Sequence, residues 1–483
     1  MVSRRGLLSG AALVGAGAMT GVIGGAGTAA ADAPLNTPFT PVTAPHLAEA
    51  ERMVQYQRLL AAGHLTAGLV GHWPLDGTPA DRSGRERPVT LGSGASWTTL
   101  RAGSELSFDG NPGAYAATSS VLDTTAPFTV SAWVRLSDTA SQDNMYTAVS
   151  QDGTTASRFL LQYDDTVRKW AFKVRSADQS VKISAVSTDA AKPAVWTHLT
   201  GVWDGTRIHL YVDGALQSSV DATVSWAATE GFNIGRARYD SAPVNRFKGS
   251  IDDVRAYDRA LTAAEVDLIS GRTADANNRY LIDSSSTVIW GTPSDLTTWI
   301  SHARCSSFLT WVLKHTYAWA SDDYFTQYFH DRIPEAADYR RAFVDGTAGP
   351  RFQRIRKVAD LQPGDLVAVD YQGSVEGSTG HIVMVRQVKG VYTGSATHRG
   401  ETQYAVEVID CTASPHGMYD KPTYAAFPDT RMVDDVTNFE GVGIGHMMFY
   451  ADDTTGEFCR YRWSVNGTSY TLDQRPVSAA RPL

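Results

Sequence analysis

The chain has 483 residues, of which 43% are hydrophobic and 19% are charged, and its formal net charge at pH 7 is -8. A chain of this length is too long to fold around one ordinary hydrophobic core, so we expect two or three domains. The acidic balance and the lack of any long basic run in the sequence give no electrostatic reason to expect nucleic acid as the main partner.

Residues 1–31 have the pattern of an export signal. Arg4 and Arg5 precede an apolar stretch rich in glycine and alanine, and small residues follow at Ala29 and Ala31. Paired arginines of this kind resemble the twin-arginine type of signal peptide, with cleavage near Ala31. A membrane anchor is the alternative interpretation. We expect the mature protein to be secreted, extracellular and free of the membrane.

Residues 32–66 are expected to form a linker that contains one short helix. The stretch 45–62, PHLAEAERMVQYQRLLAA, places Leu47, Met53, Leu59 and Leu60 among good helix formers, and Gly63 follows it. This helix either packs on a domain or belongs to a leader piece that is later removed. We favour packing.

Residues 67–273 have a hydrophobic pattern with a period of two. Strand-length alternations separated by Gly, Asp, Asn and Ser turns occur at residues 128–136, 158–163, 169–174, 196–204 and 207–214. Many short strands at this spacing indicate an all-β sandwich or jelly roll. The motif YVDGAL at 211–216 predicts a hairpin, because Asp-Gly supplies the positive φ angles of a two-residue turn.

The motifs of this segment also resemble those of a known family. VGHWPLDG, LSFDG, FTVSAWVRL, WTHLTGVWDGTRIHLYVDGAL, FNIGRA and FKGSIDDVRAYDRALTAAEV follow one another as in laminin-G-like, concanavalin A-like jelly rolls. The resemblance implies a module that binds glycans or proteins, and many such domains carry one structural calcium ion. The matching acids are Asp76, Asp109 and Asp252, which would be the ligands of that ion. The alternative is that these aspartates only cap turns.

Residues 276–475 mix helix and strand, and residues 476–483 are expected to be a C-terminal tail. HARCSSFLTWVLKHTY, residues 302–317, places Cys305, Phe308, Leu309 and Val312 on one face of a helix. Strand patterns follow at residues 365–371, 381–388, 404–410 and 445–452. A helix followed by an antiparallel sheet is an α+β arrangement.

Cys305 is one of only three cysteines in the chain. Cysteines of exported proteins tend to pair, and an odd number leaves one over. Cys411 and Cys459 could form a disulfide and leave Cys305 as a free thiol. The start of a helix lowers the pKa of a thiol through its unpaired amide hydrogens and its dipole. Cys305 is therefore a candidate nucleophile, and the alternative is an inert core residue.

His381 is the candidate base, because it opens a strand after the glycine-rich turn in GSTGHIVMV. A histidine in front of a thiol can take its proton and later protonate a leaving amine. Asp410, at the end of the next strand in sequence, is the leading candidate for the group that orients the imidazole. His416 and Ser414 are the alternatives to Asp410. His446, in GIGHMMFY, is the rival base.

RCSSFLTWV, LQPGDLV and GHIVMV stand in the order cysteine, strand, histidine, and they resemble the NlpC-like cell-wall cysteine peptidases and the related CHAP amidases. The resemblance implies a papain-like α+β domain that needs no catalytic cofactor. In this family the cysteine attacks an amide of a peptidoglycan stem peptide. Arg304 and Ser306, which flank the nucleophile, would contact the substrate.

The sequence departs from this family at several positions. Arg304 and Ser307 stand where the family usually has an aspartate and a glycine, and the aspartate would contact the ammonium group of the substrate. Residues 322–352 are an aromatic-rich insert that could line or cover the cleft.

These patterns predict a secreted cysteine hydrolase that cleaves amide bonds, with peptidoglycan or another glycan as its partner and the jelly roll as its binding module. Two alternatives stay open. One is a secreted binding protein whose third domain has lost catalysis. The other is a cysteine-dependent acyltransferase, since water is not the only possible acceptor.

Overall fold

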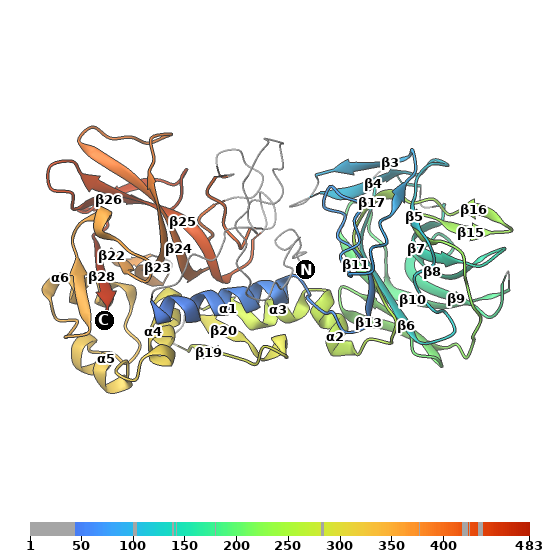
Figure 1. Cartoon of the computed structure of the whole chain (residues 1–483), viewed down its shortest axis with the longest axis horizontal. Coiled ribbons are helices and arrows are strands. Elements are labelled where there is room, and N and C mark those ends of the chain that lie inside the picture. Colours follow the sequence, from blue (N-terminus) through green and yellow to red (C-terminus); the bar gives the residue numbers. More distant parts are fainter. Residues whose placement is uncertain are drawn as a thin grey trace. The chain divides into compact units, whose positions relative to one another are not determined.

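The computed structural model describes residues 44–99, 104–137, 140, 141, 143–178, 180–281, 285–375, 377–417, 424, 426–432 and 438–483. The expected export signal at residues 1–31 lies outside this range. The described chain forms two compact units, an N-terminal unit of residues 62–273 and a C-terminal unit of residues 44–61 and 274–483 (Figure 1). None of the helices in the described ranges has the length and apolar character that crossing a bilayer requires.

The N-terminal unit consists of two antiparallel sheets. The first sheet has the strand order β13 (Ala215–Asp221), β12 (Arg207–Val212), β11 (Thr197–Trp203), β6 (Phe128–Leu136), β17 (Lys248–Tyr257), β4 (Glu105–Asp109) and β3 (Ala95–Thr98), with β1 (Leu69–Trp73) paired to β17. The second has the order β10 (Lys182–Ala190), β9 (Lys169–Arg175), β8 (Ser157–Asp164), β7 (Tyr146–Asp152), β14 (Phe232–Ile234), β5 (Ala116–Thr118) and β2 (Thr90–Leu91).

One apolar core joins the two sheets. The ring centroid of Phe128 on β6 lies 5.0 Å from that of Phe159 on β8, and the centroids of Trp73 on β1 and Phe232 on β14 are 5.1 Å apart. All four side chains are fully buried. Burying a side chain of this size stabilises a fold by about 1.5–3 kcal/mol. The prediction of an all-β jelly-roll sandwich is confirmed.

The turn between β12 and β13 has the predicted geometry. Asp213 has a φ of 49° and Gly214 a φ of 78°, and two successive positive φ angles match the right-handed twist of the strands that they connect. A second hairpin, β15 (Ala237–Tyr239) and β16 (Ala242–Val244), lies against β7 and β8. After β17, the short helix α2 (Ala263–Ile269) begins with a capping box of Thr262 and Glu265.

The C-terminal unit is built on one antiparallel sheet. Its strand order is β21 (Phe352–Ile355), β28 (Val477–Pro482), β22 (Leu366–Val375), β23 (Ser378–Val391), β24 (Glu401–Thr412), β25 (Gly441–Asp452), β26 (Phe458–Arg462) and β27 (Ser469–Thr471). A small sheet has the order β18 (Asn278–Tyr280), β20 (Ile300–Ala303) and β19 (Thr287–Ile289). The helices are α1 (Pro45–Ala61), α3 (Arg272–Asn277), α4 (Cys305–Thr316), α5 (Asp322–Phe329) and α6 (Ala336–Asp345), with one-turn helices η1 (Leu296–Thr298) and η2 (Val358–Asp360).

Helices α4 and α6 pack against the strands that carry the candidate site. Helix α4 contacts β23 and β24, whereas α6 contacts β22, β23 and β28. Aromatic rings of the expected insert join α6 to α5 and to β21. The centroids of Phe329 on α5 and Tyr339 on α6 are 4.9 Å apart, and those of Phe343 on α6 and Phe352 on β21 are 5.6 Å apart. The aromatic rings of the insert therefore pack together beside the main sheet.

One expectation about the chain ends is wrong and another is confirmed. Residues 476–483 are no tail, because β28 pairs with β22 from Val369↔Val477 to Leu366↔Ala480 and lies between two other strands. The run VSAARP has only one large apolar residue, which is why its pattern was too weak to predict a strand. Leu47, Met53 and Leu60 of helix α1 are buried, and the helix packs on α4 and β25. The expected packing of this helix is confirmed.

The expected disulfide is also wrong, because Cys411 and Cys459 are free thiols on strands that flank β25 on opposite sides. Cys411 lies opposite Val442, whereas Cys459 lies next to Arg460, the partner of Tyr450. Val442 and Tyr450 are eight residues apart along β25, so the two cysteines lie about 27 Å apart along the strand direction. A disulfide requires Cα atoms within about 7 Å.

The three aspartates expected to bind calcium do not form one ligand set. Asp109 lies opposite Lys248, and Asp252 lies four residues further along β17, or about 13 Å away. Calcium ligands all lie about 2.3–2.6 Å from one ion. Asp109 instead accepts a hydrogen bond from the Asn111 amide at 2.8 Å, so it caps its own turn. Asp76 lies in the segment after β1, just before Gly77, and the three residues do not fit the ion that the resemblance implied.

Candidate active site

Cys305 is the first residue of α4. Strand β20 leads into this helix through Arg304, whose backbone amide donates to Ser307 Oγ at 3.0 Å. The first turn of α4 carries no acidic side chain, so the positive end of the helix dipole is not offset there. Cys305 is only 3% exposed. The Cys305 thiol is therefore a buried group at the N-terminus of a helix.

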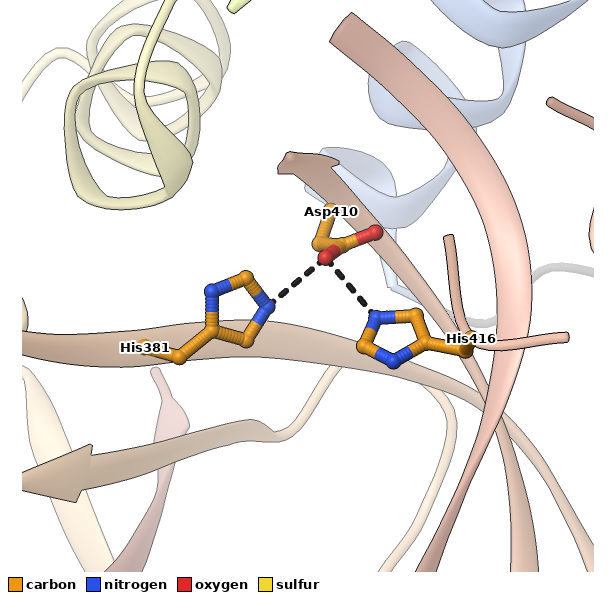
Figure 2. Close-up of side chains that lie close together, drawn as sticks. All are labelled: His381, Asp410 and His416. Carbon is orange, nitrogen blue, oxygen red and sulfur yellow. Dashed lines mark hydrogen bonds and ion pairs between the residues drawn. The ribbon is translucent and has the colours of Figure 1, made fainter. Parts of the chain in front are cut away.

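His381 and Asp410 form a buried hydrogen bond between β23 and β24. The distance from His381 Nε2 to Asp410 Oδ2 is 2.7 Å, and Figure 2 shows the carboxylate in front of the edge of the ring. Gly380, just before His381, is required by packing. A Cβ at this position would meet the carbonyl oxygen of Val369 at 2.1 Å. Gly380 thus lets β23 approach β22 closely, and this approach fixes the backbone position from which the His381 side chain extends.

The imidazole of His381 also interacts with Cys305. Burial lowers the pKa of His381, but the negative charge of the Cys305 thiolate and hydrogen bonds to Asp410 and Cys305 raise this pKa to about 9. Because Asp410 occupies Nε2, the nitrogen left for the thiol is Nδ1. The three residues stand in the order thiol, imidazole, carboxylate, which is the arrangement of a nucleophile, its base and an orienting group.

Asp410 receives donors on both carboxylate oxygens. Arg431 Nη1 lies 2.8 Å from Oδ1, and His416 Nε2 lies 3.0 Å from the same Oδ2 that His381 contacts (Figure 2). Burial raises the pKa of Asp410, but Arg431 and His416 lower it well below the ordinary value of 3.8. Asp410 is therefore an anion at neutral pH although it is completely buried.

Arg431 is held in turn by a second acid. Its Nε and Nη2 donate to the two oxygens of Asp429, at 2.9 and 2.7 Å. Space for this pair comes from glycines on β25. A Cβ at Gly443 would meet Arg431 Nε at 2.7 Å, and one at Gly445 would meet Asp429 Oδ2 at 2.3 Å. The pair of Arg431 and Asp429 thus approaches β25 more closely than any residue larger than glycine would allow.

His416 faces an acceptor on each ring nitrogen. Nε2 contacts Asp410 Oδ2, and Nδ1 lies 2.8 Å from the carbonyl oxygen of Trp463. Each ring nitrogen of His416 therefore lies within hydrogen-bond distance of an oxygen acceptor. In the described ranges, His381, Asp410 and His416 are the one group of three whose ligand atoms, all within 4.8 Å of one another, could hold a metal. The hydrogen bonds and the adjacent guanidinium disfavour a cation there.

A small pocket opens beside Cys305. Its lining includes Tyr280, Arg304, Ser306 and Glu335, so the two residues expected to contact substrate do lie next to the thiol. Arg304 Nη1 donates to Glu335 Oε1 at 2.8 Å. The expectation that the aromatic-rich insert lines the cleft is confirmed at Glu335, just before α6. An acid from another segment thus pairs with Arg304 beside the thiol.

Tyr280 is a neighbour of the thiol that the sequence did not single out. Burial and the charge of Cys305 raise the pKa of Tyr280, so its phenol stays protonated. A protonated phenol can donate a hydrogen bond into the pocket. Its element, β18, is a three-residue strand with no clear pattern, and nothing in the sequence linked it to Cys305.

The alternatives to His381 and Asp410 lie elsewhere or have other partners. Ser414 is exposed. His446 Nδ1 contacts the carbonyl oxygen of Pro428 at 2.9 Å, and its Nε2 lies 3.5 Å from Glu407 Oε1. Glu407 also pairs with Arg386, which contacts Glu51 of α1 at 2.7 Å. His446 belongs to this structural network.

The other two thiols lack the features of a nucleophile. Burial raises the pKa of Cys411 well above its ordinary value and the pKa of Cys459 to about 12. Cys411 Sγ donates to the carbonyl oxygen of Ala303 at 3.0 Å. These two cysteines are packing residues.

Comparisons with known proteins concern mainly the N-terminal unit. Residues 109–267 match the model of the Concanavalin A-like lectin/glucanases superfamily, Laminin_G_3. An uncharacterised protein of Acanthamoeba polyphaga mimivirus is 27% identical over 223 residues, which cover 44% of this chain and 90% of that protein.

Solved structures are similar at lower identity. Domain 4 of an extracellular arabinanase from Geobacillus stearothermophilus, in complex with arabinotriose, is 20% identical, covering 42% of this chain and 98% of that one, with a TM-score of 0.34. Trypanosoma rangeli sialidase is 17% identical, covering 46% of this chain and 37% of that one, with a TM-score of 0.35. The two sheets and the family match agree, and residues 109–267 form a concanavalin A-like jelly roll.

Proposed function

We propose that the C-terminal unit is a cysteine hydrolase that cleaves amide bonds, with Cys305 as nucleophile, His381 as base and Asp410 as orienting group. The observation that carries this proposal is the buried hydrogen bond between His381 and Asp410 on the ring nitrogen opposite the Cys305 thiol. An inert core cysteine has no need of an ionised carboxylate behind a neighbouring imidazole.

The first half of the reaction forms a thioester. Nδ1 of His381 takes the thiol proton, and the thiolate of Cys305 attacks the carbonyl carbon of the amide. When the tetrahedral intermediate collapses, the C–N bond breaks and the imidazolium gives its proton to the leaving amine. Asp410 keeps the ring in one tautomer and stabilises its positive charge.

The second half regenerates the enzyme. His381 takes a proton from water, the resulting hydroxide attacks the thioester carbonyl, and the C–S bond breaks. The products are a carboxylic acid and the starting pair of thiolate and imidazolium. The anionic Asp410, held by Arg431, favours the imidazolium in both halves.

The resemblance to NlpC-like peptidases suggests peptidoglycan stem peptides as the substrate. The family match of the jelly roll to lectins and glucanases supports a glycan-binding role for the N-terminal unit. Peptidoglycan contains both glycan and peptide, so it suits a protein that combines a glycan-binding module with a peptide-cleaving domain. We propose that the protein acts outside the cytoplasm, where the expected twin-arginine signal would direct it.

Incubation of the full chain with purified peptidoglycan, followed by mass analysis of the released fragments, tests this function. We expect new fragments with free carboxylate and amine ends from the wild type and none from Cys305→Ala. Supplying an added amine separates hydrolysis from acyl transfer, because a transferase would release amide-capped fragments. A Cys305→Ala variant that releases the same fragments would refute the proposal.

A further inference from the structure

A second pocket, of about 670 Å³, lies on the N-terminal unit and is far more charged than the one at Cys305. Its lining includes Lys173, Arg175, Lys182, Arg238 and the ring of Tyr239. We call this the cationic pocket. Its volume is within the range of ligand-binding sites.

The strand register places the cations on the outer face of the second sheet. Arg175 of β9 lies opposite Lys182 of β10, and Lys173 lies opposite Ser184. The residue between the two β9 cations, Val174, points the other way into the sandwich core. The floor of the cationic pocket is therefore the solvent side of β9 and β10, and not a gap in the core.

The hairpin of β15 and β16 supplies the wall. It lies against β7 and β8 and contributes Arg238 and Tyr239 to the lining (Figure 1). The guanidinium of Arg175 lies 5.0 Å from the centre of the Tyr239 ring. Tyr239 is 47% exposed, so part of this residue stays open to a ligand.

The charges of the cationic pocket are only partly compensated. Lys173 Nζ pairs with Asp164 at 2.5 Å and Arg238 Nε lies 3.4 Å from Asp152. Among the described residues that line the pocket there are four cations and no carboxylate. Burial and the charges of Lys173 and Arg175 lower the pKa of Lys182, as expected where cations crowd together.

Arg175 points most clearly to a missing partner. It is only 4% exposed, and Nη1 donates to the carbonyl oxygen of Ser180, but Nε has no hydrogen-bond partner within the described ranges. A buried donor without an acceptor costs about 1–3 kcal/mol. Asp178 interacts electrostatically with Arg175, but Nε still has no acceptor among the described residues, and an anionic ligand in the cationic pocket would supply one.

From this geometry we infer that the cationic pocket binds an acidic saccharide, with the cations on its carboxylate or sulfate groups. Hydroxyl and amide groups of Ser184, Thr166 and Asn245 complete the lining and can hydrogen-bond sugar hydroxyls. The side of Tyr239 offers an apolar surface to the C–H groups of the ring. The inference deepens the proposed glycan-binding role of the N-terminal unit and rests on it, whereas it is independent of Cys305 chemistry. The net charge of -8 does not oppose it, because a local cluster decides the field in a pocket.

The test is titration of the full-length Cys305→Ala protein with polygalacturonate, dextran sulfate and unmodified dextran by calorimetry. We expect at least 10-fold tighter binding to one or both acidic polymers than to dextran. Binding to polygalacturonate would indicate recognition of carboxylate groups, and binding to dextran sulfate would indicate recognition of sulfate groups. Lys182→Glu should weaken this binding at least 10-fold. Lys192→Glu, the same change at an exposed lysine outside the lining, should leave it unchanged.

Other outcomes overturn the inference in distinguishable ways. Equal binding to dextran and the acidic polymers, or an unaffected Lys182→Glu variant, would refute the cationic pocket and leave glycan binding in place. Failure to bind any of the three polymers would refute both the cationic pocket and the glycan-binding role. Arg175→Ala is unsuitable as the main variant because a buried residue can affect folding, whereas Lys182 is partly exposed.

Discussion

Arg431 Nη1 lies 2.8 Å from Asp410 Oδ1, on the carboxylate oxygen that His381 does not touch. One carboxylate oxygen of Asp410 thus meets the guanidinium, whereas the other meets the imidazoles of His381 and His416. Asp429 holds Arg431 from the other side. A buried chain of acid, guanidinium, acid and imidazole therefore ends at the thiol of Cys305.

Removal of the guanidinium should destabilise the C-terminal unit strongly. Arg431→Met leaves Asp410 and Asp429 buried without their shared cation, and breaking a buried pair of this kind costs about 3–5 kcal/mol. Urea unfolding measures the change. The control is Arg341→Met, since Arg341 is 62% exposed and pairs with Asp338, where we expect less than about 1 kcal/mol. Equal losses of unfolding free energy in the two variants would mean that the buried ion pairs of Arg431 stabilise the fold no more than an exposed pair does.

Replacement of the orienting carboxylate should lower turnover and leave substrate binding in place. Asp410→Asn keeps the size of the side chain but removes its charge, so we expect kcat to fall about 10²–10⁴-fold with little change in KM. The alkaline limit of activity should also move to lower pH, because the hydrogen bond to Asp410 is one of the causes that raise the pKa of His381. A variant with normal kcat and an unmoved pH profile would assign Asp410 a purely structural role.

The pH dependence should reflect a pKa of about 9 at His381. The reactive pair needs the imidazolium, so the rate should fall as the pH rises through about 9. The stability of the folded protein should change with pH in the same direction as the rate. A folded-state pKa of about 9 against the ordinary 6.5 gives stability that is fully present below pH 6.5 and lost as the pH rises to 9. Melting temperatures of the wild type and His381→Gln should converge over this window, and parallel curves would contradict the assignment.

Alkylation should single out Cys305 among the three thiols. Iodoacetamide reacts with thiolates, and the pKa values of Cys411 and Cys459 are raised, the latter to about 12. Peptide mapping after brief treatment at pH 7 should find the label on Cys305 alone. His381→Ala should slow this labelling, because it removes the cation that pairs with the thiolate. Equal labelling of Cys459, the most exposed of the three thiols, would show that Cys305 is not activated.

Arg304 and Glu335 should act on substrate binding. Both line the pocket at Cys305 and pair with each other at 2.8 Å. Arg304→Ala and Glu335→Ala should each raise KM several-fold with kcat nearly unchanged, since neither touches the reacting atoms. Which variant has the larger effect reports whether the substrate presents a carboxylate or an ammonium group to this pair. Unaltered KM in both variants would remove the pair from the binding site.

The strands and α4 could be predicted because their signals are local. The alternation at 128–136 coincides with β6, and Cys305 begins the helix that its apolar spacing indicated. His381 and Asp410 could be predicted because they lie near the start of β23 and near the end of β24. These two strands follow one another in the sequence and pair in the sheet.

The remainder of the site depends on contacts between distant segments. Arg431 and Asp429 lie on an irregular stretch that no periodicity marks, and Glu335 reaches the pocket only through the fold of the insert. One signal was available: the alternating glycines of GVGIGH on β25 indicate that another chain segment comes close. That signal shows where something packs, but it does not identify Arg431.

The most direct test of the account is intact-protein mass spectrometry of the enzyme after brief incubation with soluble peptidoglycan fragments. We predict a transient mass increase equal to the acyl fragment, located on the peptide that contains Cys305, and no such adduct on Cys305→Ala. Fragment release by Cys305→Ala at the wild-type rate, or an adduct on another residue, would contradict the central claim.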